Sequence, residues 1–210
     1  MTDHYFATPE GPERRRMITA RIWNTDYELI TANGVFSYDG LDLATGVLLR
    51  ESPAPVTARR LLDLGCGYGP IALALADHCP EAVVDAVDVN DRALSLCRDN
   101  ARALGLADRV RPLRPEQADP EVRYDEIWSN PPIRIGKPAL HDLLLTWLPR
   151  LTPTGGARLV VGKNLGGDSL QRWLVEQGYR CDRVASAKGF RVFEVSRHFL
   201  TDTPTEEVAE

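Results

Sequence analysis

Asn130, Pro131 and Pro132 form the part of this sequence with the clearest potential for chemistry. The Asn130 side chain ends in a carbonyl oxygen. The two prolines lack an N–H, so we expect a rigid loop that presents unpaired carbonyl groups. Two converging acceptors suit an NH2 group, because they bind both of its hydrogens and aim its lone pair at an electrophile. A plain proline-rich exit from a strand is the alternative, and the three residues alone do not separate the two.

A glycine-rich segment and a carboxylate indicate that the chain binds a nucleoside. Gly65, Gly67 and Gly69 occupy alternate positions, which allows a tight turn and a close approach to a ligand. This GxGxG spacing differs from the GxGxxG of dinucleotide folds, which argues against a pyrophosphate ligand. Asp88 lies 19 residues after Gly69, and a carboxylate there can accept hydrogen bonds from both hydroxyls of a ribose.

These groups also have structural alternatives. The glycine segment can be a tight turn without a ligand. Asp88 can be the N-cap of the next helix, although Asn90 or Asp91 fits that position better. Asp85 is a competing acid, but it precedes the end of its strand. Cys66 has no histidine near it in the sequence, so we interpret it as a small filler rather than a nucleophile.

The elements that must position these residues alternate along the chain. The sequence predicts strands at 60–64, 82–88, 110–113, 124–129 and 157–162, with helices at 70–78, 91–104, 138–148 and 168–177. The sequence also predicts a short helix at 41–50 and two hairpins. The first hairpin pairs 17–22 with 27–31 around a turn at 24–26, and the second pairs 179–185 with 190–195. Alternation of this kind predicts a parallel sheet covered by helices, with ligands at the carboxyl ends of its strands.

LDLGCGYG at 62–69 and AVDVN at 86–90 resemble the first and second motifs of class I S-adenosylmethionine-dependent methyltransferases. The resemblance implies S-adenosylmethionine as cofactor and a Rossmann-like α/β fold with a mostly parallel seven-stranded sheet whose last strand is antiparallel. It implies that Asp88 holds the ribose and Val89 packs on the adenine, with Glu116 as the candidate for the adenine amine. The expected cofactor-binding residues are Phe36, Thr45, Asp63, Gly65, Cys66, Gly67, Gly69, Asp88, Val89, Glu116 and Asn130.

Asn-Pro-Pro followed by an aromatic residue resembles the motif of methyltransferases that act on planar amino groups, although residue 133 is Ile here. GVFS at 34–37, DGLD at 39–42 and Thr45 resemble the ribosomal small-subunit RNA guanine-N2 methyltransferase family, and NPPIRIGK, VVGKN and KGFRV resemble its small single-domain members. The resemblance implies Asn130, Pro131 and Pro132 as catalytic residues. It also implies substrate contacts from Ile133, Arg134, Lys137, Lys163 and Arg191, together with Lys188. Candidates for the missing aromatic ring are Trp128, Phe36, Phe190 and Tyr5.

We therefore expect residues 1–55 to form an arm and a hairpin–helix extension that packs on the cofactor side. Residues 56–200 should form the methyltransferase domain, and residues 201–210 an acidic flexible tail. Two other functions stay open at this point. One is N-methylation of a glutamine side-chain amide in a protein, and the other is a non-catalytic scaffold that binds S-adenosylmethionine.

Composition and charge limit the kinds of partner that the chain can have. The formal net charge is −5, yet residues 130–200 carry 11 basic and 5 acidic residues. This basic half could attract a polyanion such as RNA, or it could be a solvated surface. Scattered histidines and cysteines predict no metal site. No apolar run reaches the ~18 residues of a membrane span, and no signal peptide is evident. We expect a cytoplasmic monomer that meets ribosomal RNA, either naked or within an assembled small subunit.

Overall fold

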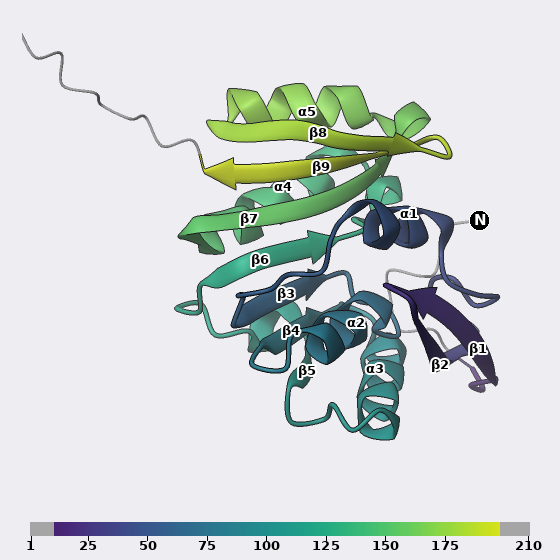
Figure 1. Ribbon diagram of the computed structural model, residues 1–210. Helices are drawn as coiled ribbons and strands as arrows, with labels where there is room; N and C mark the ends of the chain where they lie inside the picture. Colours follow the sequence, from purple (N-terminus) through teal and green to yellow (C-terminus); the bar gives the residue numbers. More distant parts are fainter. Residues whose placement is uncertain (1–10, 198–210) are drawn as a thin grey trace, which may run out of the picture.

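A seven-stranded sheet forms the centre of the structure (Figure 1). The computed structural model describes residues 11–197. The sheet order is β5-β4-β3-β6-β7-β9-β8, and only the pairs that involve β9 are antiparallel. The strands are β3 (Arg60–Leu64), β4 (Val83–Val87), β5 (Val110–Leu113), β6 (Tyr124–Ser129), β7 (Leu151–Gly162), β8 (Tyr179–Ala187) and β9 (Phe190–Arg197). The predicted Rossmann-like α/β sheet with an antiparallel last strand is confirmed.

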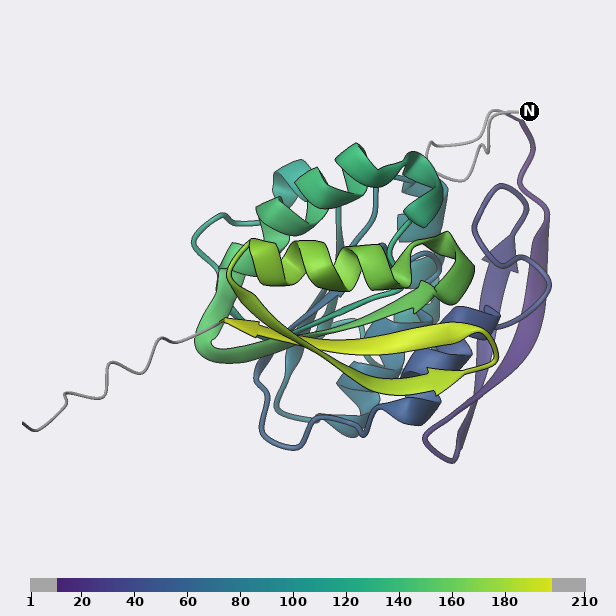
Figure 2. The same cartoon turned by 90° about the horizontal axis from the view of Figure 1, so that it is seen from above.

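Helices cover both faces of this sheet (Figure 2). They are α1 (Leu43–Glu51), α2 (Pro70–His78), α3 (Asp91–Ala103), α4 (Lys137–Trp147) and α5 (Gly167–Glu176). The buried side chains of α1, α2 and α3 join one hydrophobic cluster, whereas those of α4 and α5 join a second cluster. Central strands such as β3 are buried on both faces, so the β3 sequence, RLLDL, is mostly apolar and lacks the regular polar–apolar alternation of a half-exposed strand.

β7 is longer than predicted because residues 151–156, which include Gly155 and Gly156, also belong to the strand. The prediction began at residue 157, but β7 begins at Leu151. Its pairing with β6 shifts register between Tyr124 and Glu126. At this irregularity a Cβ on Gly155 would lie 2.8 Å from the carbonyl oxygen of Tyr124. A glycine therefore lets the two backbones approach each other inside the strand.

The N-terminal hairpin consists of β1 (Arg15–Ile22) and β2 (Thr25–Ala32). The prediction of a turn at residues 24–26 is wrong, because Ile22 already pairs with Thr25. The turn consists of Trp23 and Asn24, whose φ angles are 44° and 69°. Two consecutive residues with positive φ are typical of the tight turn whose twist matches that of the strands.

Asn100 fastens this hairpin to α3 and to the glycine-rich segment. Its Oδ1 accepts a hydrogen bond from Ile30 N at 2.7 Å, and its Nδ2 donates to Ile30 O at 2.9 Å and to Tyr68 O at 3.0 Å. The Asn100 residue is only 1% exposed. The hairpin therefore lies against the elements that carry the glycine-rich turn. The domain boundary after residue 55 stays a prediction, and the expected tail at 201–210 lies outside the described residues.

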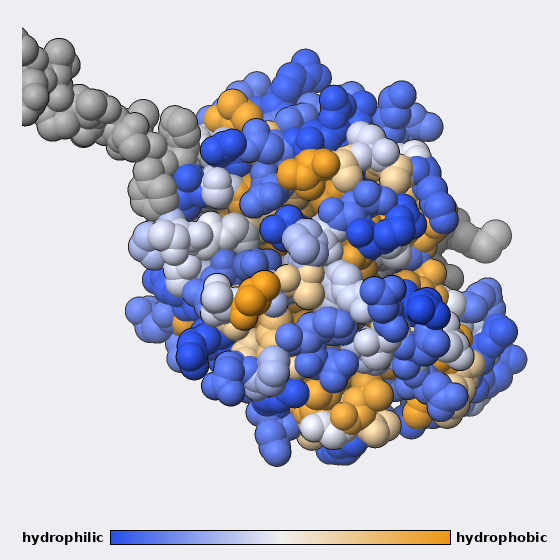
Figure 3. All heavy atoms as spheres, viewed as in Figure 1, coloured by the Kyte–Doolittle hydropathy of each residue, from blue (hydrophilic) through white to orange (hydrophobic). Residues whose placement is uncertain are grey.

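The part of the chain that the structure describes contains no helix with the length and hydrophobicity to cross a membrane. Between residues 11 and 197, no three His, Cys, Asp or Glu side chains are grouped so that they could hold a metal ion. On the face seen in Figure 3, hydrophobic residues occur in small groups among hydrophilic ones.

We predict that Asn100→Ala lowers the free energy of unfolding by about 2–3 kcal/mol, because it leaves the partly buried N–H and C=O of Ile30 and the buried C=O of Tyr68 without this partner. Urea denaturation measures this change. Arg102→Ala, on the same helix, is the matched control, since Arg102 makes an exposed ion pair with Asp99. Equal stability of the two variants would show that Asn100 does not hold the hairpin.

Candidate active site

A cavity of about 340 Å³ opens at the carboxyl ends of the parallel strands. This volume is within the range of small-molecule sites. Its walls come from the segment before α1, the glycine-rich turn, the end of β4, the loop after β6 and the start of β9. The predicted site residues that line it are Phe36, Thr45, Gly65, Cys66, Gly67, Asp88, Val89, Asn130, Pro131, Pro132, Ile133 and Arg134.

The glycine-rich turn is held by hydrogen bonds to the neighbouring strand. Gly65 N and Cys66 N both donate to Val87 O, at 2.8 and 3.0 Å. Gly65 and Gly67 have φ angles of 80° and 56°, and a Cβ on either would meet no atom within 4 Å. The bare backbone thus forms the floor of the cavity. Burial raises the pKa of the Cys66 thiol, which fits a small filler rather than a nucleophile.

Gly69 supports the turn from behind the cavity. Its φ is 95°, and a Cβ there would lie 2.6 Å from Cys97 Sγ on α3. Pro70 follows as the first residue of α2. Gly69 therefore packs the turn against a helix and does not line the cavity.

Asp88 is oriented by two main-chain hydrogen bonds. Its Oδ2 accepts from Gly67 N at 2.8 Å, and its Oδ1 accepts from Asn90 N at 2.9 Å. Burial raises the pKa of the Asp88 carboxyl, and these hydrogen bonds oppose the shift. Asn90, one of the two predicted candidates, is the N-cap of α3. The competing acid Asp85 instead bonds Arg60, Arg111 and Tyr124 inside the sheet.

Asp63 does not line the cavity, although it was expected to contact the cofactor. Its carboxyl is 1% exposed, and Oδ2 accepts a hydrogen bond from Ala72 N at 2.9 Å in the first turn of α2. Burial raises the pKa of Asp63 to about 8, with a smaller contribution from the nearby Asp88 charge. Asp63 is therefore a neutral acid at neutral pH that ties β3 to the helix after the glycine-rich turn.

The Asn130 amide is held from its nitrogen side. Nδ2 donates to Asp42 Oδ2 at 2.8 Å and to Thr45 Oγ1 at 3.0 Å. A carboxylate only accepts hydrogen bonds, so the amide nitrogen must face Asp42. This orientation leaves Oδ1 as the group that Asn130 can offer to a ligand in the cavity. The preceding Ser129 is fully buried and donates to Leu64 O at 2.6 Å.

Asp42 is the site residue that the sequence analysis missed. It is the N-cap of α1, where its side chain accepts from Thr45 N at 2.9 Å. An aspartate directly before an apolar helical segment signals an N-cap. Nothing in the sequence signals its second bond to Asn130, because the two residues are 88 positions apart.

The prediction of unpaired proline carbonyls is wrong. Pro131 O accepts from Ile133 N at 2.8 Å, and Pro132 O accepts from Ile135 N at 3.1 Å. The chain turns into a short 3-10 helix, Ile133–Ile135, and so uses one lone pair of each carbonyl. Each oxygen retains a second lone pair that can accept another donor.

Two further predicted contacts do not reach the cavity. Glu116 is an exposed residue of a short 3-10 helix and forms an ion pair with Arg114 at 2.8 Å, while its neighbour Pro115 lines the cavity instead. Arg191 is 8% exposed and contacts Asp168, so it is not available to a substrate in this structure.

The remaining candidates surround the cavity unevenly. Lys137 begins α4 and lines a small hollow beside Ile133, whereas Lys163 is exposed next to Gly162. Trp128 cannot replace the missing ring, because it is fully buried and donates to Glu126. Phe36 and Phe190 are the aromatic candidates that line the cavity, and Tyr5 lies outside the described residues.

Comparisons with known proteins agree with this geometry. A family model described as the methyltransferase small domain matches residues 26–194. A solved structure described as Thermus thermophilus 16S rRNA N2 G1207 methyltransferase (RsmC), in complex with AdoMet and guanosine, matches with a TM-score of 0.73 and 25% identity. That match covers 90% of this chain and 52% of that chain.

Two curated relatives show how much of each protein is shared. The uncharacterized protein YbxB of Bacillus subtilis (strain 168) is 28% identical over 94% of this chain and 100% of its own length. Ribosomal RNA small subunit methyltransferase C of Salmonella choleraesuis is 34% identical over 64% of this chain but only 40% of its own length. The chain therefore spans less than half of that named methyltransferase.

We predict that Asp88→Ala weakens the binding of S-adenosylmethionine by about 2–3 kcal/mol, the magnitude of lost hydrogen bonds to a charged group. Isothermal titration calorimetry measures the affinity. Asp91→Ala is the control, because the Asp91 side chain is 59% exposed and pairs with Arg114. Wild-type affinity in Asp88→Ala would show that another residue holds the ribose.

We predict that Asp63→Asn reduces the pH dependence of stability. The Asp63 pKa is about 8 in the native state, and about 4 for an unperturbed aspartate. Between these values the native state binds a proton that the unfolded state lacks, so the free energy of unfolding falls as the pH rises. Asparagine resembles the protonated acid and should remove this loss.

Chemical denaturation at several pH values between about 5 and 8 tests this prediction against the exposed control Asp108→Asn. A smaller decline for Asp63→Asn than for the wild type is expected. If the free energy of unfolding of the wild type and of Asp63→Asn changed with pH in the same way, the Asp63 carboxyl would titrate normally.

Proposed function

The chain belongs to the methyltransferase small domain family, and from this premise we propose that it transfers a methyl group to N2 of guanine in ribosomal RNA. It is an S-adenosylmethionine-dependent methyltransferase by family. An amino group is the proposed methyl acceptor because the Asn130 amide is fixed in orientation: Asp42 and Thr45 hold its nitrogen, so its oxygen can accept a hydrogen bond from the substrate.

The described residues fit the cofactor. Gly65 and Gly67 leave the floor of the cavity bare, and the Asp88 carboxyl stands beside it to accept hydrogen bonds from ribose hydroxyls. Val89 is 43% exposed at the same edge and offers an apolar surface to a base. When bound, S-adenosylmethionine supplies a methyl group that is already activated by its sulfonium.

Asn130 and Pro131 then act on the amine that receives the methyl group. Asn130 Oδ1 accepts one N–H of the amine, and the second lone pair of Pro131 O accepts the other. With both hydrogens bound, the nitrogen lone pair points at the methyl carbon, which is an orientational gain. The new C–N bond forms as the sulfur–methyl bond breaks, and the methylated nitrogen releases one proton to water.

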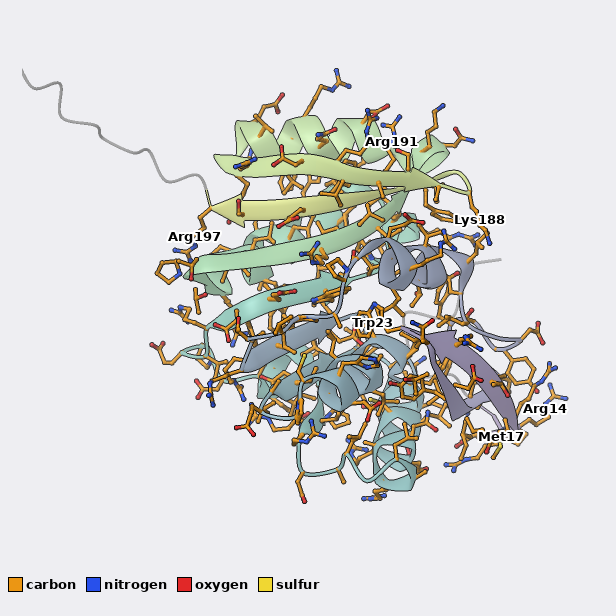
Figure 4. The ribbon with its side chains drawn as sticks, viewed as in Figure 1. Arg14, Met17, Trp23, Lys188, Arg191 and Arg197 are labelled. Carbon is orange, nitrogen blue, oxygen red and sulfur yellow. The ribbon has the colours of Figure 1, made fainter. Side chains whose placement is uncertain are left out.

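RNA as substrate is supported by the basic residues at the rim and by the names of the relatives. Arg134 lines the cavity, and Lys163 N bonds Gly189 O at 2.8 Å, next to Lys188 at the tip of the β8–β9 hairpin (Figure 4). Such cations can contact phosphates, which orients a nucleic acid without reading its sequence. The target base must leave its stack to reach Asn130.

Transfer of labelled methyl from S-adenosylmethionine to small ribosomal subunits, total RNA and protein extract tests the proposal. We predict label in RNA that digestion identifies as N2-methylguanosine. Asn130→Ala should cut single-turnover rates by ~10²–10³, the cost of one transition-state hydrogen bond, while its affinity for S-adenosylmethionine stays near that of the wild type.

Two outcomes would contradict this function. Label in a glutamine side chain would assign the activity to a protein amide, which presents the same NH2 geometry. Cofactor binding without transfer to any fraction would leave a scaffold. Near-normal turnover of Asn130→Ala would remove the role of its amide in either reaction.

A further inference from the structure

We propose that Phe190 is the ring on which the target guanine stacks, in place of the aromatic residue that the motif lacks at Ile133. The inference rests on the proposed function and concerns the substrate side of the same cavity. Phe190, Ile133 and Asn130 all line that cavity.

The order of the strands divides the cavity into two halves. β3 and β4 end at the glycine-rich turn and at Asp88, which form the cofactor half. β6, β7 and β9 lie on the other side of β3. Phe190 is the first residue of β9 and pairs with Gly162 at the end of β7. β7 in turn pairs with the end of β6, which directly precedes Asn130. Phe190 therefore belongs to the half that must receive the substrate.

The two faces of the sheet place Phe190 and Ile133 on opposite sides of this half. Phe190 packs against the hydrophobic cluster that contains α1, as does Val192 two residues later. Ile133 packs against the cluster that contains α4 and α5. Asn130 bonds Asp42 and Thr45 at the start of α1. A planar base that enters toward Asn130 thus meets an aliphatic side chain on one side and the Phe190 ring on the other.

Of the other rings that line the cavity, Tyr68 is 2% exposed and donates its hydroxyl to Gly40 O at 3.2 Å, and Phe36 lies in the cofactor half. Two residues before Phe36, Gly34 O accepts from Asn90 Nδ2 at 2.9 Å. Asn90 also donates its backbone N–H to Asp88, so this bond fastens the Phe36 segment beside the ribose-binding carboxylate. By its position Phe36 is a neighbour of the cofactor.

Steady-state methylation of ribosomal RNA by Phe190 variants tests the proposal. Phe190→Leu removes the ring but keeps an apolar side chain of similar bulk, whereas Phe190→Tyr keeps the ring. We expect Phe190→Leu to lower kcat/KM for RNA about 5- to 100-fold, the range of base stacking on an aromatic residue. Phe190→Tyr should stay near the wild type, and the affinity for S-adenosylmethionine should not change.

A rescue variant separates stacking from packing. Ile133→Phe supplies a ring directly after the Asn-Pro-Pro motif, on the other side of the base. In the Phe190→Leu background it should restore most of the lost kcat/KM, which a general loss of packing would not allow. The melting temperature of each variant is measured in parallel, and Phe36→Leu is the matched control, expected to change cofactor affinity rather than KM for RNA.

Three results would overturn the proposal. The first is a wild-type kcat/KM in Phe190→Leu, and the second is a loss of cofactor affinity in that variant as large as its loss of activity. The third is no rescue by Ile133→Phe in a double variant with wild-type melting temperature. Failure of the proposed function looks different, because the wild-type enzyme would then place no methyl group on guanine.

Discussion

The hydrogen bonds from Asn130 Nδ2 to Asp42 and Thr45 are the contacts on which the rest of the site depends. They join the loop after β6 to the first turn of α1, although Asn130 and Asp42 are 88 positions apart in the sequence. Asp42 at once caps α1 and sets the orientation of the amide. One carboxylate therefore links a stability role with a chemical one. Without this link, Asn130 could turn either its oxygen or its nitrogen toward an amine, and only the oxygen can accept the hydrogens of that amine.

The cofactor half is prepared in the same way, by hydrogen bonds that exist before any ligand binds. Val87 O holds two N–H groups of the glycine-rich turn, and Gly67 N holds Asp88. Below them, the buried Asp63 bonds α2 as a neutral acid. The two acids at the ends of adjacent strands have different environments. Asp63 is enclosed and supports the turn, whereas Asp88 reaches the cavity and can meet a ribose.

The sequence predicted those parts of the structure that glycine, proline and apolar runs mark out. β3, β5, β6 and α2 have the predicted bounds, because turn residues stand at their ends. The hairpin turn was misplaced, since only the strand register puts Trp23 and Asn24 at positive φ. Side-chain direction was the other source of error. The family resemblance implied that Glu116 and Arg191 lie near the ligand, but ion pairs with Arg114 and Asp168 turn them elsewhere. Asp42 was missed because its partner is distant in the sequence.

The central claim is that Asn130 presents its amide oxygen to the amine that is methylated. A crystal structure of the protein with S-adenosylhomocysteine and guanosine tests it most directly. The account predicts guanine N2 within about 2.7–3.2 Å of Asn130 Oδ1, the range of an N–H···O hydrogen bond, with Nδ2 still bonded to Asp42. Guanine N2 bonded directly to the Asp42 carboxylate, with the Asn130 amide turned away from the cavity, would contradict it.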